Sequence, residues 1–226
     1  MFKKKESENV LVINFKTYFE SSGKKAEELA KIANRVAKKT GKNIILAVQE
    51  TDIHLLSQLV TIPIYSEHLD PIEYGAHTGK VLAQSLKYNG ASGVLLNHSE
   101  DRFDLHKIEE SIKIAKKNGL KVIVCANDAE QSAAIAVFKP DYIAVEPPEL
   151  IGGNVSVSEA KPEIIFETIE KVNSIKKVPV LCGAGVKTAD DVKKAIGLGS
   201  AGVLVASGVI KARYIEHKIE ELVRFL

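Results

Sequence analysis

The chain has 226 residues, of which 45% are hydrophobic and 27% charged, and its formal net charge at pH 7 is +2. These values argue against a disordered or fibrous chain and favour one large globular domain, expected to span residues 1–226. They also argue against nucleic acid as a partner, because a polyanion requires a strongly basic surface.

The cysteines and the lengths of the apolar runs predict the cellular compartment of the protein. Cys125 and Cys182 lie inside apolar runs and lack CxxC spacing, so we expect buried reduced thiols rather than a disulfide or a metal site. No apolar run approaches the length of a membrane span, and the first residues, MFKKKESENV, contain no signal-peptide core. We therefore expect a cytoplasmic protein with no membrane partner.

Eight short apolar runs recur along the chain, and we expect each to be a β-strand. The runs do not alternate apolar with polar residues, which indicates strands covered on both faces and paired in parallel. In chain order they are residues 10–15 (VLVINF), 43–48 (NIILAV), 61–66 (TIPIYS), 93–97 (GVLLN), 121–126 (KVIVCA), 142–146 (YIAVE), 178–183 (VPVLCG) and 202–207 (GVLVAS).

The segments between these runs have helical spacing. Apolar residues three and four positions apart predict a helix face against the sheet after the fourth run and again at the end of the chain. These residues are Leu105, Ile108, Ile112 and Ala115, and then Ile215, Ile219, Leu222 and Leu226. The Asn-Gly pairs at 89–90 and 118–119 are expected to end two helices, because glycine adopts the left-handed conformation needed there.

About eight strand and helix units in a chain of this length predict a closed (β/α)8 barrel, or TIM barrel, as a single α/β domain. An open doubly wound sheet is the alternative. It is disfavoured because the first strand is followed by NFKTYFESSGKK rather than by a GxGxxG turn.

In such a barrel the chemistry lies at the carboxyl ends of the strands. The first run ends at Asn14 and Lys16, the fourth at His98 and the sixth at Glu146. An apolar mouth would raise the pKa of Glu146 and make it a stronger base. A lysine near a glutamate is commonly a surface ion pair, and a lone histidine is commonly structural, so the inference depends on all of these residues meeting.

Two kinds of loop follow the later strands. PPELIGG, residues 147–153, has a stiff proline pair and a flexible glycine pair, which suits a lid over the barrel mouth; an ordinary loop is the alternative. The turns 183–185 and 206–208 consist of small residues, which lets main-chain amides approach a phosphate group near a short helix. Glycines that merely permit tight turns are the alternative there.

Five motifs then occur in order: NFK (14–16), NHSE (97–100), VEPPELIGG (145–153), CGAGV (182–186) and LVASG (204–208). Together they resemble the triosephosphate isomerase family in its shorter archaeal form. The resemblance implies an intramolecular aldose-ketose isomerase of glycolysis and gluconeogenesis. It would interconvert dihydroxyacetone phosphate and D-glyceraldehyde 3-phosphate through an enediolate, without a cofactor or metal.

The resemblance also implies a role for each matched residue. Glu146 would move the proton, His98 would polarise the carbonyl as a neutral imidazole, and Lys16 would stabilise the enediolate and phosphate charge. Asn14 would orient the substrate, and Glu100 would pair with Lys16. The residues implied at the phosphate are Asn14, Lys16, Ile151, Gly152, Gly153, Gly183, Ala184, Gly185, Ala206 and Ser207.

YGAHTGK, residues 74–80, resembles the loop by which family members enter a neighbouring subunit. Thr78 and Gly79 would then lie at a subunit interface near the neighbour's Lys16, in a homodimer or in the homotetramer of archaeal relatives. A helix N-cap formed by Thr78 is the alternative.

Three other functions fit parts of the pattern. A sugar-phosphate epimerase would hold a metal ion through His68, His98 and Glu146. An aldolase would use Lys16 as a Schiff base, although pairing with Glu100 would keep that lysine charged. A non-catalytic sensor of phosphorylated ligands would share the same barrel.

Overall fold

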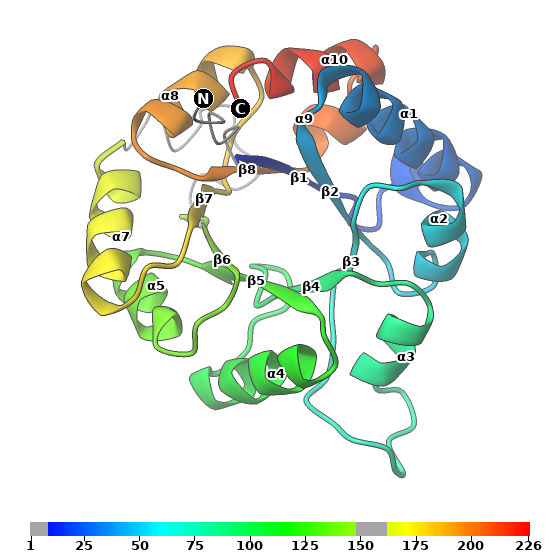
Figure 1. Cartoon of the computed structure of the whole chain (residues 1–226), viewed down its shortest axis with the longest axis vertical. Coiled ribbons are helices and arrows are strands. Elements are labelled where there is room, and N and C mark those ends of the chain that lie inside the picture. Colours follow the sequence, from blue (N-terminus) through cyan, green and yellow to red (C-terminus); the bar gives the residue numbers. More distant parts are fainter. Residues whose placement is uncertain (1–8, 148–161) are drawn as a thin grey trace, which may run out of the picture.

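A computed structural model describes residues 9–147 and 162–226. Eight strands close into a barrel in which neighbours in sequence pair in parallel and β8 returns to β1 (Figure 1). This is the expected (β/α)8 barrel. The strands are β1 (Val10–Asn14), β2 (Asn43–Val48), β3 (Ile64–Ser66), β4 (Gly93–Leu96), β5 (Lys121–Ala126), β6 (Tyr142–Val145), β7 (Val180–Cys182) and β8 (Gly202–Val205).

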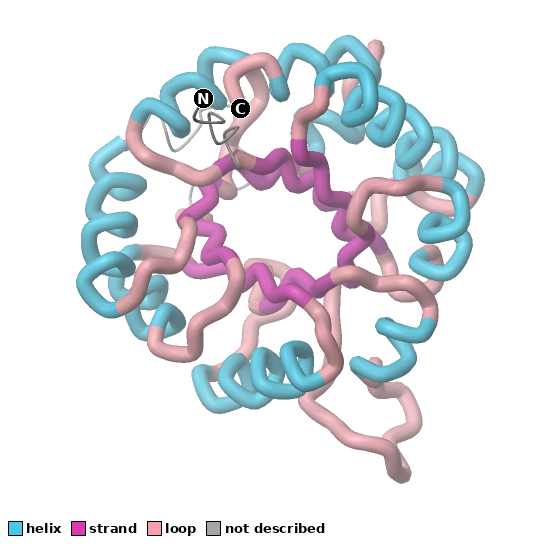
Figure 2. The backbone as a smooth tube through the Cα atoms, in the orientation of Figure 1, coloured by secondary structure: helices cyan, strands magenta, loops and turns pink. Residues whose placement is uncertain are grey.

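The helices form a ring outside the strands (Figure 2). They are the short 3-10 helix η1 (Phe19–Ser21) and α1 (Lys24–Thr40), α2 (Ile53–Leu59), α3 (Ala83–Tyr88), α4 (Leu105–Lys117), α5 (Ala129–Ala136), α7 (Pro162–Ile175), α8 (Ala189–Gly197), α9 (Ser207–Ile210) and α10 (Ile215–Val223). Both Asn-Gly predictions are confirmed: α3 and α4 end before Asn89 and Asn118, and Gly90 and Gly119 have φ of 97° and 67°.

Each strand packs on both of its faces, which explains the absence of alternation in the sequence. In β1, Val10 and Val12 belong to a core inside the barrel, whereas Leu11 and Ile13 belong to the larger core under the helices. The inner core fills the barrel with one or two residues from each strand. Val12, Ala144 and Leu181 are among its members. The next inward-facing position after each of them along the chain lies at the carboxyl end of its strand.

Two sequence predictions were wrong in detail. The third strand was expected from Thr61 but begins at Ile64, because Pro63 has no N–H to donate to the ladder. Leu105 was expected on the buried face of its helix but is 47% exposed. It is the first residue of α4, beside the capping residue Asp104, and the buried stripe starts one turn later at Ile108.

Within residues 9–147 and 162–226, no helix has both the length and the apolar character that crossing a membrane requires.

Candidate active site

The strand ends place polar residues directly above the inner core. Because successive strand residues face opposite ways, Asn14 continues the inward row of Val12, and Glu146 continues that of Ala144. Both are buried: Asn14 is 3% exposed and Glu146 only 1%. Such burial at the end of an apolar strand is costly for polar groups and points to a site rather than to packing.

A cavity of about 230 Å³ brings the predicted residues together. Its lining includes Lys16, His98, Glu100 and Glu146, together with residues 183–187 and 204–208. The groups therefore come from the ends of β1, β4, β6, β7 and β8, which meet at one mouth of the barrel. Tyr18 also lines this cavity and was not singled out by the sequence.

Lys16 is held in an uncommon backbone conformation. Its φ is 50°, a region that costs a non-glycine residue about 1–3 kcal/mol. The Asn14 side chain supports this turn, since its Oδ1 accepts a hydrogen bond from the Lys16 backbone N–H at 3.1 Å. The turned backbone directs the Lys16 ammonium to Glu100, where Nζ and Oε1 lie 2.8 Å apart. The predicted pair of Lys16 with Glu100 is thus present.

His98 has a defined tautomer. The backbone N–H of Glu100 donates to His98 Nδ1 at 3.2 Å, so the ring proton of the neutral imidazole is on Nε2. Burial and, after it, the nearby Lys16 charge lower the pKa of His98 to about 4. His98 therefore presents a neutral N–H donor on the cavity side, where Nε2 lies 3.8 Å from Glu146 Oε1.

Glu146 combines a raised pKa with an open hydrogen-bonding position. Burial raises its pKa to about 7, while a hydrogen bond from the Cys125 thiol opposes this rise. Among the described residues its Oε2 has no hydrogen-bond partner. Cys125 is itself buried, and burial raises its thiol pKa, so it stays a neutral donor. A carboxylate with a pKa near neutrality and a free oxygen is suited to accept a proton.

Gly183 has a second role that the sequence did not reveal. A Cβ built at this glycine would lie 2.5 Å from Glu146 Cγ, so the missing side chain makes room for the carboxylate. Gly183 was expected at the phosphate site, and it does line the cavity together with Ala184, Gly185, Ala206 and Ser207. A Cβ at Gly208 would lie 3.1 Å from the Val186 carbonyl oxygen, which shows how closely the two turns approach.

Some predicted residues lie elsewhere. Ile151, Gly152 and Gly153, and with them most of the expected lid, lie outside the described residues. Thr78 and Gly79 lie on the exposed segment between β3 and α3, which projects from the barrel in Figure 1. Thr78 is not a helix N-cap, since α3 begins later at Ala83 after the capping position Leu82.

A second cavity, of about 250 Å³, adjoins the first and shares Lys16, His98 and Glu100 with it. Glu67 is one of its lining residues, and burial raises the pKa of this carboxyl group to about 8. Within the described chain its Oε1 has no hydrogen-bond partner. Glu67 was not among the residues predicted from the sequence. The alternation of β3 could have found it, because Tyr65 belongs to the inner core and Glu67 is the next inward position.

The three residues that an epimerase would use as metal ligands, His68, His98 and Glu146, do not converge on one point. His68 directs its two ring nitrogens to Asp101 and Asp70 rather than toward Glu146. Across residues 9–147 and 162–226, no group of three or more His, Cys, Asp or Glu side chains is arranged to hold a metal ion.

Known proteins are similar to this chain in sequence and in fold. The sequence model described as triosephosphate isomerase matches residues 9–223. Triosephosphate isomerase of Methanocaldococcus jannaschii is 48% identical over 218 residues, covering 96% of this chain and 100% of that protein. Triosephosphate isomerase of Methanothermus fervidus is 48% identical over 215 residues, covering 95% of this chain and 97% of that protein.

A solved structure supports the architecture independently. The crystal structure of triosephosphate isomerase from Bartonella henselae superposes with a TM-score of 0.75 at 17% identity, covering 94% of this chain and 97% of that one. At this identity the likeness demonstrates the fold alone.

Proposed function

The chain belongs to the triosephosphate isomerase family and interconverts dihydroxyacetone phosphate and D-glyceraldehyde 3-phosphate, and we propose that Lys16, His98 and Glu146 carry this reaction. The reaction belongs to glycolysis and gluconeogenesis. The observation behind the proposal is that these three side chains, from three separate strands, line one cavity beside two turns of small residues.

Glu146 is the proposed base. Its carboxylate removes a proton from the carbon beside the substrate carbonyl and returns it to the neighbouring carbon, so no cofactor has to carry electrons away. A pKa of about 7 makes it a stronger base than an exposed glutamate while leaving much of it ionised at neutral pH. The unpaired Oε2 supplies an acceptor position for that proton.

His98 and Lys16 are proposed to stabilise the enediolate. The negative charge that develops on the carbonyl oxygen requires donors already in place, because reorganising them during the reaction would cost part of their effect. His98 offers its Nε2–H as a neutral donor, and Lys16 offers a fixed positive charge. Asn14 acts by holding the Lys16 backbone, and Glu100 by holding the Lys16 ammonium and the His98 ring.

The phosphate group is proposed to bind along the two turns that line the cavity after β7 and β8. There the turns 183–185 and 206–208 contain only small residues, so main-chain N–H groups can approach an anion. By family likeness we add Ile151, Gly152 and Gly153, on the lid that would exclude water from the enediolate. By the same likeness Asn14 and Lys16 complete the set; Lys16 lines this cavity, whereas Asn14 lines the adjoining one.

We further propose that the whole chain, residues 1–226, forms one catalytic domain that works in the cytoplasm as a homodimer or homotetramer. Thr78 and Gly79 would enter the neighbouring subunit near its Lys16. Support comes from the segment itself, which is exposed from Glu73 to Lys80 and projects from the barrel. Light scattering at assay concentration tests this, and an active monomer would refute it.

A coupled isomerase assay on the purified protein tests the assignment of the residues. Glu146→Gln, His98→Gln and Lys16→Ala should each abolish most of kcat while the variants stay folded. The assay is repeated after exhaustive chelation and in the presence of borohydride with substrate. Loss of activity on chelation would favour the epimerase chemistry, and covalent trapping at Lys16 would favour the aldolase.

A further inference from the structure

The turn after β4 carries two of the proposed site residues, His98 and Glu100. Its two ends are closed by Asn97, whose Oδ1 accepts from the Phe103 N–H at 2.8 Å and whose carbonyl accepts from Arg102 at 2.7 Å. The middle of the turn holds Glu100 and Asp101. Their placement decides where the Glu100 N–H meets His98 and where the Glu100 carboxylate meets Lys16.

The Glu100 carboxylate is poorly fixed by its own surroundings. Its side chain is 62% exposed, and an exposed ion pair is worth only about 0–1 kcal/mol because solvent screens it and two side chains must be ordered. The ion pair with Lys16 therefore depends on a backbone that is already in the right place. Within the turn the Asp101 N–H donates to the His98 carbonyl at 2.9 Å, and a side-chain contact to Asp101 would hold this middle part to the rest of the barrel.

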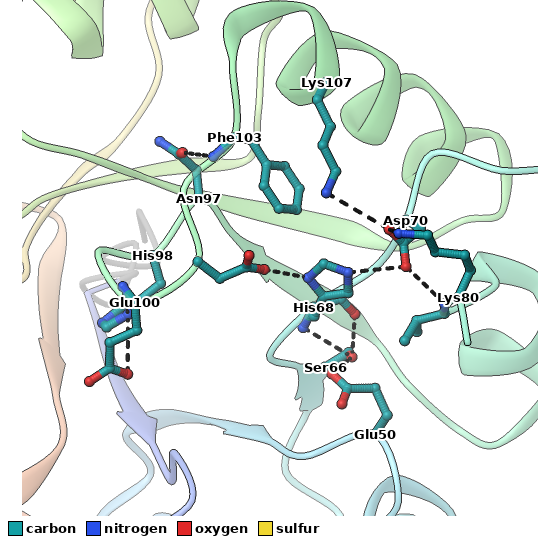
Figure 3. A network of polar contacts seen from close by, with 12 residues as sticks. Glu50, Ser66, His68, Asp70, Lys80, Asn97, His98, Glu100, Phe103 and Lys107 are labelled. Carbon is teal, nitrogen blue, oxygen red and sulfur yellow. Dashed lines mark hydrogen bonds and ion pairs between the residues drawn. The ribbon is translucent and has the colours of Figure 1, made fainter. Parts of the chain in front are cut away.

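His68 supplies a contact at that point. Its Nδ1 lies 2.6 Å from Asp101 Oδ2. Its Nε2 lies 3.2 Å from Asp70 Oδ2 (Figure 3). A carboxylate only accepts hydrogen bonds, so in the contact with Asp101 the Nδ1–H of His68 is the donor. Phe103 packs edge-on against the ring, with centroids 5.5 Å apart, and so fixes its plane.

The two carboxylates differ in what else holds them. Asp70 also accepts from the Val81 N–H at 2.9 Å and from Lys80 at 3.3 Å, and Lys107 lies 3.8 Å away, as Figure 3 shows for the two lysines. The Asp101 side chain is 57% exposed, and within the described part of the chain its carboxylate contacts the His68 ring. Loss of the His68 contact therefore leaves Asp70 in place but releases the Asp101 carboxylate, while the Asp101 N–H still donates to the His98 carbonyl.

His68 itself is anchored to the strands below. The Ser66 hydroxyl lies 2.6 Å from the His68 carbonyl and 2.9 Å from Glu50 Oε1, which ties this residue to the ends of β2 and β3. Figure 3 shows His68 between Asp70 and the loop that carries His98 and Glu100. The ring thus connects a rigid part of the barrel to the middle of the turn.

We propose that His68 is a positioning residue for the isomerase reaction: by holding Asp101 through Nδ1, it fixes the turn that presents His98 and Glu100 to Lys16. This rests on the proposed roles of His98 and Lys16. His68 touches no substrate and acts only through the turn. The contact through Nε2 to Asp70 anchors the ring and has no direct effect on the reaction.

Two substitutions separate the two contacts. In His68→Asn the side-chain amide N–H takes the place of Nδ1 and can still donate to Asp101, whereas in His68→Gln it takes the place of Nε2 and donates to Asp70. Displacing a reacting group by about 1 Å can cost about 100-fold, and a loosened turn is displaced only part of the time, so we expect kcat of His68→Gln to fall about tenfold. Its KM should change by less than about twofold, and His68→Asn should retain most of kcat.

Asp101→Ala provides the matched test, since it removes the other partner of the same contact. It should lower kcat as much as His68→Gln does, and the double variant should be no slower than either, because both substitutions break one interaction. Circular dichroism and thermal melting confirm that all variants are folded.

Equal losses in His68→Asn and His68→Gln, an unchanged kcat in His68→Gln, or additive losses with Asp101→Ala would each overturn the proposal. Lys16→Ala is measured alongside. Full activity in Lys16→Ala would refute the proposed function itself, which separates that failure from a failure of the role of His68.

Discussion

Gly183→Ala tests whether the position of Glu146 depends on an absent side chain. The new Cβ would lie 2.5 Å from Glu146 Cγ, and ordinary contacts begin at 3.4 Å, so the two groups must separate by about 0.9 Å. Glu146 is buried and cannot relax toward solvent. A misplacement of about 1 Å at a reacting group can cost about 100-fold, so kcat should fall by roughly that factor, with a smaller change in KM.

The assay is steady-state isomerase turnover in both directions, with thermal melting to verify folding. Gly197→Ala is the matched control, because a Cβ there meets nothing within 4 Å and the residue ends α8 without a positive φ. It should leave kcat unchanged and stabilise the helix by about 0.5–1 kcal/mol. If Gly183→Ala is folded and as fast as the parent protein, the contact with Glu146 does not position the base.

Three further outcomes follow from the buried carboxyl groups. Glu146→Asp, which withdraws the carboxylate by about one methylene (~1 Å), should lower kcat by orders of magnitude with little change in KM, and an unaltered kcat would remove Glu146 from the role of base. Since Glu146 acts ionised and its pKa is about 7, kcat/KM should rise with pH and level off above that value; a flat profile from pH 5 to 9 would contradict this. Glu67→Gln tests the raised pKa of Glu67, about 8: the folded state keeps this proton while the unfolded state releases it near pH ~4.3, so the stability that Glu67 contributes is lost as pH rises toward 8. Denaturant unfolding should therefore show that the free energy of unfolding of the variant, relative to that of the parent protein, rises by about 1 kcal/mol or more between pH 4 and pH 8. A difference that stays constant with pH would contradict the raised pKa.

The local sequence determined the architecture of this protein and much of its site. The eight strands could be predicted without knowing their neighbours in space, because a strand buried on both faces must be apolar throughout. Asn-Gly pairs marked the ends of α3 and α4, since only a few residues adopt the left-handed backbone there. Strand alternation puts Asn14 on the face of Val12 and Glu146 on the face of Ala144, whereas the closed barrel shows that this face is the inner one.

Only the tertiary structure decided how the site is tuned. The room that Gly183 leaves for Glu146, the proton position on His98, the raised pKa of Glu67 and the bridge made by His68 each depend on groups brought from other strands. Burial and hydrogen bonding are set by every neighbour in space, and the sequence orders only neighbours along the chain. The closure of the barrel therefore determined these properties, including that of Glu67, which the sequence had not singled out.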